Sequence, residues 1–331
     1  MTQKDLLIVN YCHRSCMPLM NIMRLPESRA FALARQMAEQ NRGDTAFHRF
    51  ADFDNYYYAR LETDRALRSQ FMALGGNPVQ EHPLSFVLQG SDFLDDWFGN
   101  GIVTKIPLYV VPGNQISFTF GDSMTTLRER GTLRMMTKAG LLEAISDFNG
   151  TPEDFLADAA AKHRYIEVQV WDDADVLEYC RAESMRTGLI DFLLRAKKST
   201  YAGKGRPVGS SRLLSHDFSY TEGDFLYYDT YVGGEKFSGE EVLYVSGRPH
   251  WSMNYAGRVL GDGFSGDFLK DALCHVDARM PFRGPPRYSD GFYDYSCEVR
   301  GDFGWFQGRE EISFKNTVIY EAVFHGTLIT G

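Results

Sequence analysis

A duplication in the C-terminal third constrains the fold of this chain more than any other feature. The segment 237–257 (FSGEEVLYVSGRPHWSMNYAG) aligns without a gap with the segment 306–326 (FQGREEISFKNTVIYEAVFHG), at an offset of 69 residues. Seven of the 21 positions match in residue type, and most of them hold aromatic residues or glycines: Phe237 with Phe306, Gly239 with Gly308, Glu241 with Glu310, Leu243 with Ile312, Trp251 with Tyr320, Tyr255 with Phe324 and Gly257 with Gly326. If one inserted residue is allowed, Tyr227 and Gly233 fall opposite Tyr295 and Gly301.

The duplication indicates one β-hairpin unit that is used twice. A single hairpin cannot bury its own apolar face, so each copy is expected to pack against the other. A helix is predicted between the copies at about 267–276, and the amphipathic stretch 187–198 precedes the first copy. The order of hairpin, helix and hairpin therefore predicts an α+β fold, in which an antiparallel sheet carries one or two packed helices.

Length and composition indicate a globular protein of two domains. The chain has 331 residues, of which 44% are hydrophobic, and this is sufficient to bury a substantial core. The net charge of −9 argues against a general nucleic-acid-binding face. It still allows nucleic acid to bind in a local basic groove. No stretch approaches 18 consecutive apolar residues, so no membrane span is expected.

The five cysteines are scattered and form no CxxC pair, which is typical of reduced thiols in the cytoplasm. Cys12, His13 and Cys16 lie close together in the sequence, but a tetrahedral zinc site would need a second ligand pair with similar spacing. No such pair is present, so no metal is expected.

The N-terminal half, residues 1–180, is predicted to be a mixed α+β domain. The boundary is expected near 172–183, and residues 184–331 form the second domain. Apolar runs and periodicity predict strands at 6–11, 82–88, 102–111, 115–120 and 165–171, and helices at 27–40, 63–74, 138–147 and 151–162. Thr151 is expected to cap the last of these helices, because it is followed by Pro152 and Asp154.

Several unusual sequence motifs in the C-terminal half occur in the same order as in a known bacterial family. They are FLLRAKKSTYAG (192–203), YYDTYVGGEKFSGEE (227–241), PHWSMNYAG (249–257), MPFRGPP (280–286) and GDFGWFQGREEI (301–312). Over about 187–331 the chain resembles the domain of unknown function family 5680. The resemblance implies a compact α+β module that is often attached to other domains, and it implies no reaction.

Seven residues of this half are candidates for a ligand site: Asp229, Glu241, Trp251, Asn254, Tyr255, Arg283 and Glu310. Glu241 and Glu310 stand at the same place in the two copies, and such an acid pair would suit general acid–base chemistry. The alternative is that the two glutamates cap turns or form ion pairs with Arg283 and Arg309.

Two further features of this half have alternative interpretations. Trp251, Asn254 and Tyr255 could stack and hydrogen-bond a flat ligand, but alternation also places Trp251, Met253 and Tyr255 on one face, as in a sheet core. The glycine-rich basic loop 197–212, with Arg283 and Arg287, could hold an anion, although it lacks a phosphate-loop motif.

Two segments of the N-terminal half, NYCHRSCMPLMNIM and YIEVQVW, faintly resemble the opening and closing segments of ADP-ribosyltransferases of the DarT and RNA 2'-phosphotransferase kind. The resemblance implies that NAD is consumed, with His13 as the ribose ligand, Tyr57 stacked on the nicotinamide and Glu167 as the catalytic acid. Arg60 and Tyr56 would contact the cofactor. The family's His-x-Thr motif corresponds to His13-Arg14-Ser15 in this chain. When the following helix is aligned with the family, however, Cys12 falls at the position of the histidine.

Each of these residues also has a structural interpretation. His13 could be a hydrogen-bonded loop residue, the tyrosine run could be a partly buried surface, and Glu167 could face outward from an edge strand. The leading hypothesis is therefore an NAD-consuming ADP-ribosyltransferase or glycohydrolase with an accessory module and an unidentified small-molecule or macromolecular acceptor. The alternatives are a non-catalytic ligand-binding or regulatory adaptor, and a C-terminal module that restrains a toxic N-terminal half.

Overall fold

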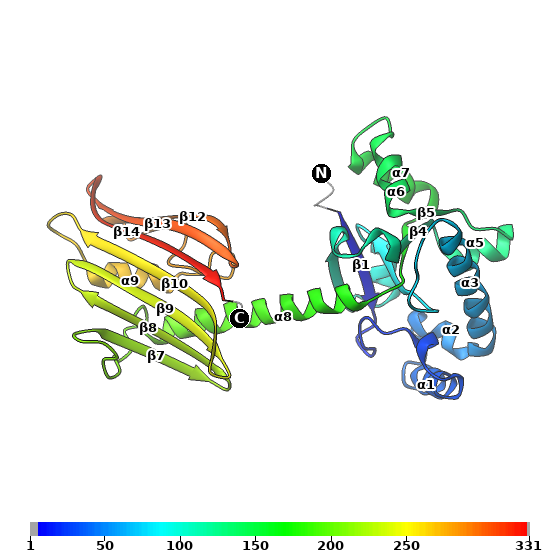
Figure 1. Ribbon diagram of the computed structural model, residues 1–331, viewed down its shortest axis with the longest axis horizontal. Helices are drawn as coiled ribbons and strands as arrows, with labels where there is room; N and C mark the ends of the chain where they lie inside the picture. The colour runs from blue at the N-terminus through cyan, green and yellow to red at the C-terminus, as the bar shows by residue number, and fades with distance from the viewer. Residues whose placement is uncertain (1–5, 330–331) are drawn as a thin grey trace. The chain divides into compact units, whose positions relative to one another are not determined.

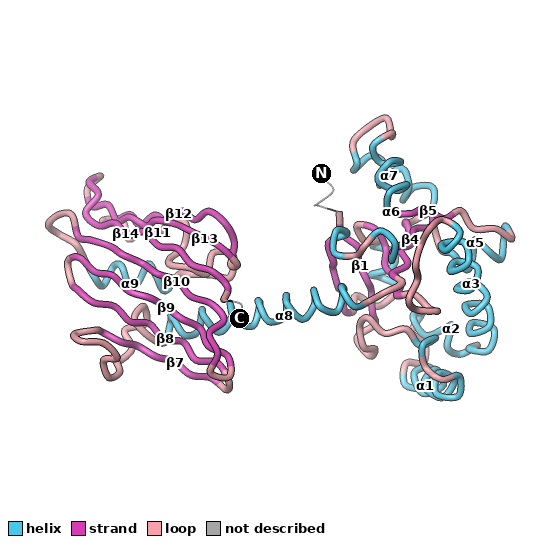
Figure 2. Tube along the Cα trace, viewed as in Figure 1, coloured by secondary structure: helices cyan, strands magenta, loops and turns pink. Residues whose placement is uncertain are grey.

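The computed structural model describes residues 6–329, and the chain divides into two compact units, Met1–Arg181 and Ala182–Gly331 (Figure 1). Both units combine helices with one antiparallel sheet, so the fold is α+β (Figure 2). The division falls within helix α8 (Ala174–Ser199). Among the helices of the described residues, none is long and apolar enough to cross a membrane.

The N-terminal unit is built on a six-stranded sheet with the strand order β3-β1-β2-β6-β4-β5. Every pairing in this sheet is antiparallel. The strands are β1 (Leu7–Cys12), β2 (Leu84–Leu88), β3 (Ile102–Pro107), β4 (Ile116–Phe120), β5 (Met135–Thr137) and β6 (Ile166–Val170). Strand β2 lies between β1 and β6, so the sheet brings the first and last strands of the unit within one strand of each other.

Seven α-helices and four short 3-10 helices complete the described part of this unit before α8. The α-helices are α1 (Glu27–Gln40), α2 (His48–Ala51), α3 (Phe53–Ala73), α4 (Asp92–Trp97), α5 (Ser123–Arg130), α6 (Lys138–Ser146) and α7 (Pro152–His163). The 3-10 helices are η2 (Ile22–Arg24), η3 (Thr45–Phe47), η4 (Leu108–Val110) and η5 (Gly113–Gln115). Helix α7 begins with the expected cap, because the Thr151 and Asp154 side chains each accept a hydrogen bond from the other residue's backbone N–H.

Helix α3 is the main departure from the sequence prediction in this unit, because it begins at Phe53 and not at residue 63. Its first turns are rich in aromatic residues and have little intrinsic helix propensity. They are held by packing: the Phe31 ring of α1 lies 5.0 Å from the Phe53 ring and 5.1 Å from the Tyr57 ring. The extension places Tyr56, Tyr57 and Arg60 on the helix.

The C-terminal unit contains an eight-stranded antiparallel sheet with the order β11-β12-β13-β14-β10-β9-β8-β7. Its strands are β7 (His216–Glu222), β8 (Phe225–Gly233), β9 (Lys236–Val245), β10 (Arg248–Val259), β11 (Arg287–Ser289), β12 (Tyr293–Asp302), β13 (Trp305–Phe314) and β14 (Thr317–Leu328). Helix α9 (Gly266–Cys274) separates β10 from β11. Each copy of the repeat is thus one helix followed by four strands, twice the two-strand unit that the sequence predicted.

The two copies meet about a pseudo-two-fold axis between β10 and β14. Tyr255 pairs across these strands with Phe324, its own counterpart in the other copy. The contacts between the copies are reciprocal: the Phe237 ring stacks on Tyr320 at 6.2 Å, and the equivalent Phe306 ring stacks on Trp251 at 5.6 Å. The expectation that each hairpin packs against its copy is confirmed.

The glycines that match between the copies stand opposite aromatic rings. Gly239 pairs with Tyr255, and Gly308 pairs with Phe324. A Cβ atom on Gly239 would lie 2.5 Å from the Tyr255 ring, and one on Gly308 would lie 2.4 Å from the Phe324 ring. The rings therefore occupy the space that a side chain on the opposite strand would need, which explains why glycine and aromatic residues recur together.

Helix α9 and the second half of α8 form one hydrophobic core with the sheet. The buried helix residues are Leu189, Ile190, Phe192, Leu193 and Ala196 in α8 and Phe268, Leu269, Ala272 and Leu273 in α9. Both helices lie on the same side of the strands in Figure 1. The prediction of one or two packed helices is confirmed, with two.

Candidate functional site

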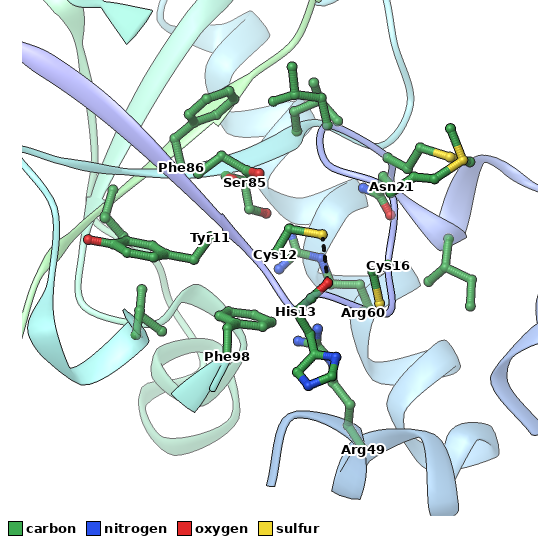
Figure 3. A pocket seen from close by; sticks show the side chains of 18 of the residues that line it. Tyr11, Cys12, His13, Cys16, Asn21, Arg49, Arg60, Ser85, Phe86 and Phe98 are labelled. Atoms are coloured by element: carbon green, nitrogen blue, oxygen red, sulfur yellow. Dashed lines mark hydrogen bonds between the residues drawn. The ribbon is translucent and has the colours of Figure 1, made fainter. Parts of the chain in front are cut away.

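The N-terminal unit contains a cavity of about 450 Å³ (Figure 3). Its wall comes from β1 and the loop after it, from α1, α2 and α3, from β2, and from β6. Four of the five N-terminal residues that the sequence singled out line it: His13, Tyr56, Arg60 and Glu167. Residues separated by more than 100 positions in the chain therefore face one space.

Glu167 lies on an interior strand. It pairs with Val87 of β2 on one side and with Thr119 of β4 on the other, and only 5% of its surface is exposed. The outward-facing edge position considered as an alternative is therefore wrong. One carboxylate oxygen, Oε2, accepts the backbone N–H of Ser123, the first residue of α5, at 2.7 Å. Burial raises the pKa of Glu167, whereas the charge of Arg60 and the Ser123 N–H oppose this rise.

Arg60 joins Glu167 to a second buried acid. Its Nη1 lies 3.7 Å from Glu167 Oε1, and its Nε lies 2.8 Å from Asp64 Oδ1, one helical turn further along α3. The other oxygen of Asp64 lies 2.6 Å from His82 Nδ1, and Asp64 has no exposed surface. Burial alone would lower the pKa of Arg60, but Asp64 and Glu167 raise it above its ordinary value, so Arg60 is a fixed positive charge.

Two arginine groups in this region keep unused hydrogen-bond donors. Arg60 Nη2 and Arg49 Nε are buried and have no hydrogen-bond partner among the described residues, and both arginines line the cavity (Figure 3). Buried donors are rarely left unpaired, because desolvation without a partner costs about 1–3 kcal/mol. Acceptor oxygens are the groups that donors of this kind would bind.

The sequence left two interpretations of His13, a residue that binds the ribose or a hydrogen-bonded loop residue. In the structure it is a hydrogen-bonded loop residue. Its Nδ1 accepts the backbone N–H of Ser15 at 3.1 Å, and its Nε2 lies 3.1 Å from Asp44 Oδ2. The edge of the ring packs on Phe47, with the centroids 4.9 Å apart. Both nitrogens are thus engaged, and the side chain contributes a fixed wall to the cavity.

The tyrosine run divides between the cavity and the core. Tyr57 does not line the cavity, because it packs with Phe31 and Phe53. Tyr56, the preceding residue on α3, lines it instead, and the Arg49 guanidinium lies 5.3 Å from the Tyr56 ring centroid. A helix turns 100° per residue, so Tyr56 and Tyr57 point in different directions from α3.

Sequence reasoning missed several residues of this site. Asp122 and Tyr165 also line the cavity, and Asp64 and His82 lie behind Arg60. The i, i+4 spacing of Arg60 and Asp64 would have indicated their contact if the helix had been predicted to begin at residue 53. No local signal connects His82 with Asp64. Among the described residues, no group of three or more His, Cys, Asp or Glu side chains has the arrangement of a metal site.

In the C-terminal unit the structure brings together five of the seven candidates: Asp229, Glu241, Tyr255, Arg283 and Glu310. Three of them, Asp229, Glu241 and Arg283, line a space of only about 20 Å³ together with Lys197 from α8. All five residues and Lys197 are buried, with at most 7% of the surface of each exposed. The sequence placed Lys197 only in a possible anion-binding loop, whereas in the structure it forms an ion pair with Glu241.

The charges of this buried cluster satisfy one another. Glu310 accepts hydrogen bonds from Arg283 Nη2 at 2.8 Å, from Tyr295 at 2.6 Å and from Tyr320 at 2.9 Å. Arg283 Nη1 also lies 3.7 Å from Glu241. The predicted ion pairing of the two glutamates is confirmed for Arg283, which contacts both of them. The suggested role of Arg309 is wrong, because this residue points to Glu311 on the other face of β13.

Asp229 is the least compensated acid of the cluster. Its Oδ1 accepts the Tyr255 hydroxyl at 2.7 Å, and it pairs across the strands with Glu241. Burial, reinforced by the charge of Glu241, raises the pKa of Asp229 to about 7. Burial also lowers the pKa of Lys197, against the opposing charge of Glu241.

The remaining C-terminal candidates lie apart from this cluster. Trp251 has no exposed surface and stacks on Phe303 at 5.3 Å, so the interpretation of Trp251 as core packing is confirmed. Asn254 is exposed on the opposite face of β10. Lys197 and Arg283, proposed as parts of an anion-binding loop, are directed to carboxylates instead.

Comparison with known proteins gives one match. The sequence model of a family described as Domain of unknown function (DUF5680) matches residues 229–329, and this supports the resemblance seen in the C-terminal half. No curated protein and no solved structure matches the chain.

Proposed function

We propose that the N-terminal unit is an NAD-consuming enzyme, an ADP-ribosyltransferase or a glycohydrolase, with Glu167 as its catalytic carboxylate. The observation that carries the proposal is the convergence of Glu167, Arg60 and Tyr56 on one cavity of about 450 Å³. A buried carboxylate beside an arginine with an unpaired N–H suits a substrate that has both a developing positive charge and phosphate oxygens.

The reaction requires cleavage of the bond between the ribose C1' atom and the nicotinamide nitrogen. The nicotinamide leaves with the bonding electron pair, and the ribose acquires oxocarbenium character, which a nearby carboxylate stabilises. The acceptor oxygen, or water in a glycohydrolase, then forms the new C–O bond and loses a proton. The raised pKa of Glu167 makes this carboxylate a stronger base for that proton.

The other cavity residues have supporting roles in this proposal. Arg60, held by Asp64, offers Nη2 to a phosphate oxygen, and Arg49 offers Nε. Tyr56 provides the aromatic face on which a flat ring can stack. His13 is kept as a wall residue, because its two nitrogens already have partners.

The experiment follows NAD labelled in its adenylate half, incubated with the full chain in cell extract and in buffer. Macromolecular label, free ADP-ribose and nicotinamide are measured. We expect Glu167→Gln to reduce turnover by at least about 100-fold while preserving the fold, because glutamine can still accept the Ser123 N–H. Glu129→Gln, an exposed glutamate in the same unit, is the matched control.

Two outcomes would overturn the proposal. Equal turnover by the wild-type chain and the Glu167→Gln variant would remove Glu167 from the chemistry. Absence of both turnover and NAD binding with the wild-type chain, in extract as well as in buffer, would favour the non-catalytic adaptor. If label is transferred, its sensitivity to nuclease or protease identifies the class of acceptor.

A further inference from the structure

The cavity wall contains two cysteines that the proposed chemistry does not use. Cys12 is the last residue of β1, and Cys16 lies in the turn that follows; both line the cavity and both are free thiols. The Cys16 backbone N–H donates to the His13 carbonyl at 2.8 Å, which turns the chain back toward the end of β1. Figure 3 labels both cysteines among the side chains that line the cavity.

The two thiols have different surroundings. Cys12 is 8% exposed, and its Sγ donates to the His13 carbonyl oxygen at 3.4 Å. Cys16 is partly exposed and packs beside Met37, Ala46 and Phe47. Cys16 is therefore the more exposed residue of the pair.

The same surroundings separate the protonation states of the pair. Interaction with the Cys12 thiol, and then the charge of Arg49, lower the pKa of Cys16 to about 7 against the effect of burial. The interaction with Cys16, together with burial, raises the pKa of Cys12. The pair therefore combines a thiol that ionises near neutral pH with one that stays protonated, which is the arrangement of a nucleophilic and a resolving cysteine.

We propose that Cys16 and Cys12 form a peroxide-sensitive pair, in which Cys16 is oxidised first and Cys12 then closes a disulfide. The Cys16 thiolate attacks one oxygen of a hydroperoxide, the O–O bond breaks, and the leaving oxygen takes up a proton, so that Cys16 becomes a sulfenic acid. The Cys12 sulfur then attacks the Cys16 sulfur, the S–O bond breaks and water leaves with the Cys12 proton. Two thiols lose two electrons, and the hydroperoxide is reduced to an alcohol, or to water when it is hydrogen peroxide.

The disulfide can be detected directly in the full chain. Arg14 lies between the cysteines, so trypsin separates the peptides 5–14 and 15–24 unless a disulfide joins them. After reduction, desalting and treatment with a small excess of hydrogen peroxide, mass spectrometry is expected to find these peptides linked. Reduction should release them. Linkage of any other pair of cysteines would overturn the proposal.

Alkylation of the untreated wild-type chain tests the reactivity without any substitution. Iodoacetamide at pH 7 is expected to label Cys16 roughly tenfold or more faster than Cys180, because burial raises the pKa of Cys180. The rate at Cys16 should rise with a midpoint near pH 7. Equal rates at the two cysteines would overturn the assignment of Cys16 as the nucleophile.

Variants then separate the two roles. Cys12→Ser should stop the reaction at a sulfenic acid on Cys16, trapped by dimedone, whereas Cys16→Ser should prevent oxidation of Cys12. Cys180→Ser, in the same unit, is the matched control and should still form the disulfide. Trapping on Cys12 instead of Cys16 would reverse the roles and refute the proposed order of reaction.

Discussion

Each of the two units buries a network of ionisable side chains, but among the described residues only the N-terminal network lies beside a space large enough for a ligand. The network of the N-terminal unit borders a cavity of about 450 Å³, which Glu167 and Arg60 line. Asp64 contacts Arg60, and His82 contacts Asp64. In the C-terminal unit, a larger set of charges surrounds about 20 Å³, which holds no more than a water molecule.

The two networks differ in how many of their hydrogen-bonding groups have a partner within the protein. Glu310 has three partners within its own unit, and Arg283 contacts both glutamates. Arg60, by contrast, has a buried N–H without a partner in the described part of the chain. Burial of charge alone therefore does not identify a functional site. A satisfied cluster holds the protein together, whereas an unsatisfied group beside a cavity indicates where a ligand would bind.

The largest expected effect concerns the satisfied cluster. Replacing Arg283 with methionine leaves Glu310 and Glu241 without their shared counterion, and removing one partner of a buried ion pair costs about 3–5 kcal/mol. We expect this loss in the free energy of unfolding of the C-terminal unit, measured by urea titration of the full chain with hydrogen exchange of the β10 amides. Arg309→Met, at an exposed pair, is the control and should change it by less than about 1 kcal/mol. A loss of under about 1 kcal/mol for Arg283→Met would show that the cluster is not structural.

The next effect is the pH dependence that Asp229 gives to the same unit. Its pKa is about 7 in the folded protein against an ordinary value of 3.8, so the folded state binds the proton more tightly. The protonated Asp229 therefore contributes to the free energy of unfolding, and this contribution is fully present below about pH 4. It is lost as the pH rises through 7, by up to about 1.4 kcal/mol per pH unit.

Asp229→Asn isolates that contribution, because asparagine can still accept the Tyr255 hydroxyl. The difference in unfolding free energy between the wild-type chain and the variant should fall between pH 5 and 7 and become constant above about pH 8. A difference that is independent of pH over this range would mean that Asp229 is ionised in the folded protein.

A smaller effect is expected from the packing of the repeat. Gly308→Ala would place a Cβ atom 2.4 Å from the Phe324 ring, and overpacking of this kind costs about 1–3 kcal/mol. Gly234→Ala is the control, because nothing lies within 4 Å of its Cβ position. Thermal unfolding of the two variants should differ accordingly. Equal stability would show that the Phe324 ring can move aside, and that this core is less closely packed than its geometry indicates.

The secondary structure and the duplication could largely be read from the sequence, because they depend on local pattern. The predicted helix at 27–40 has the bounds of α1, and the matched residues 237–257 and 306–326 fall on equivalent hairpins. The start of α3 could not be read in this way, because aromatic contacts with α1 stabilise its first turns. The strands β7 and β11 were also missed. Each is paired on one side only, and most of their residues are exposed or half-buried.

The candidate sites show the same limit. Residue types suited to chemistry could be named from the sequence. The stacking role, however, was given to Tyr57, although of the two tyrosines it is Tyr56 that lines the cavity, and Lys197 was assigned to an anion-binding loop and not to the buried acids. One residue of helical rotation separates the two tyrosines, and the spacing in the sequence cannot resolve it until the helix is placed.

The sequence by itself determined that the C-terminal half is a repeat, since glycine and aromatic residues at a fixed offset encode the same cross-strand contacts twice. Only the tertiary structure decided which buried charges are satisfied and which face a cavity. Glu167 and Glu310 are both buried acids on interior strands. They differ in the partners that residues distant in the chain supply, and partners of that kind leave no local pattern in the sequence.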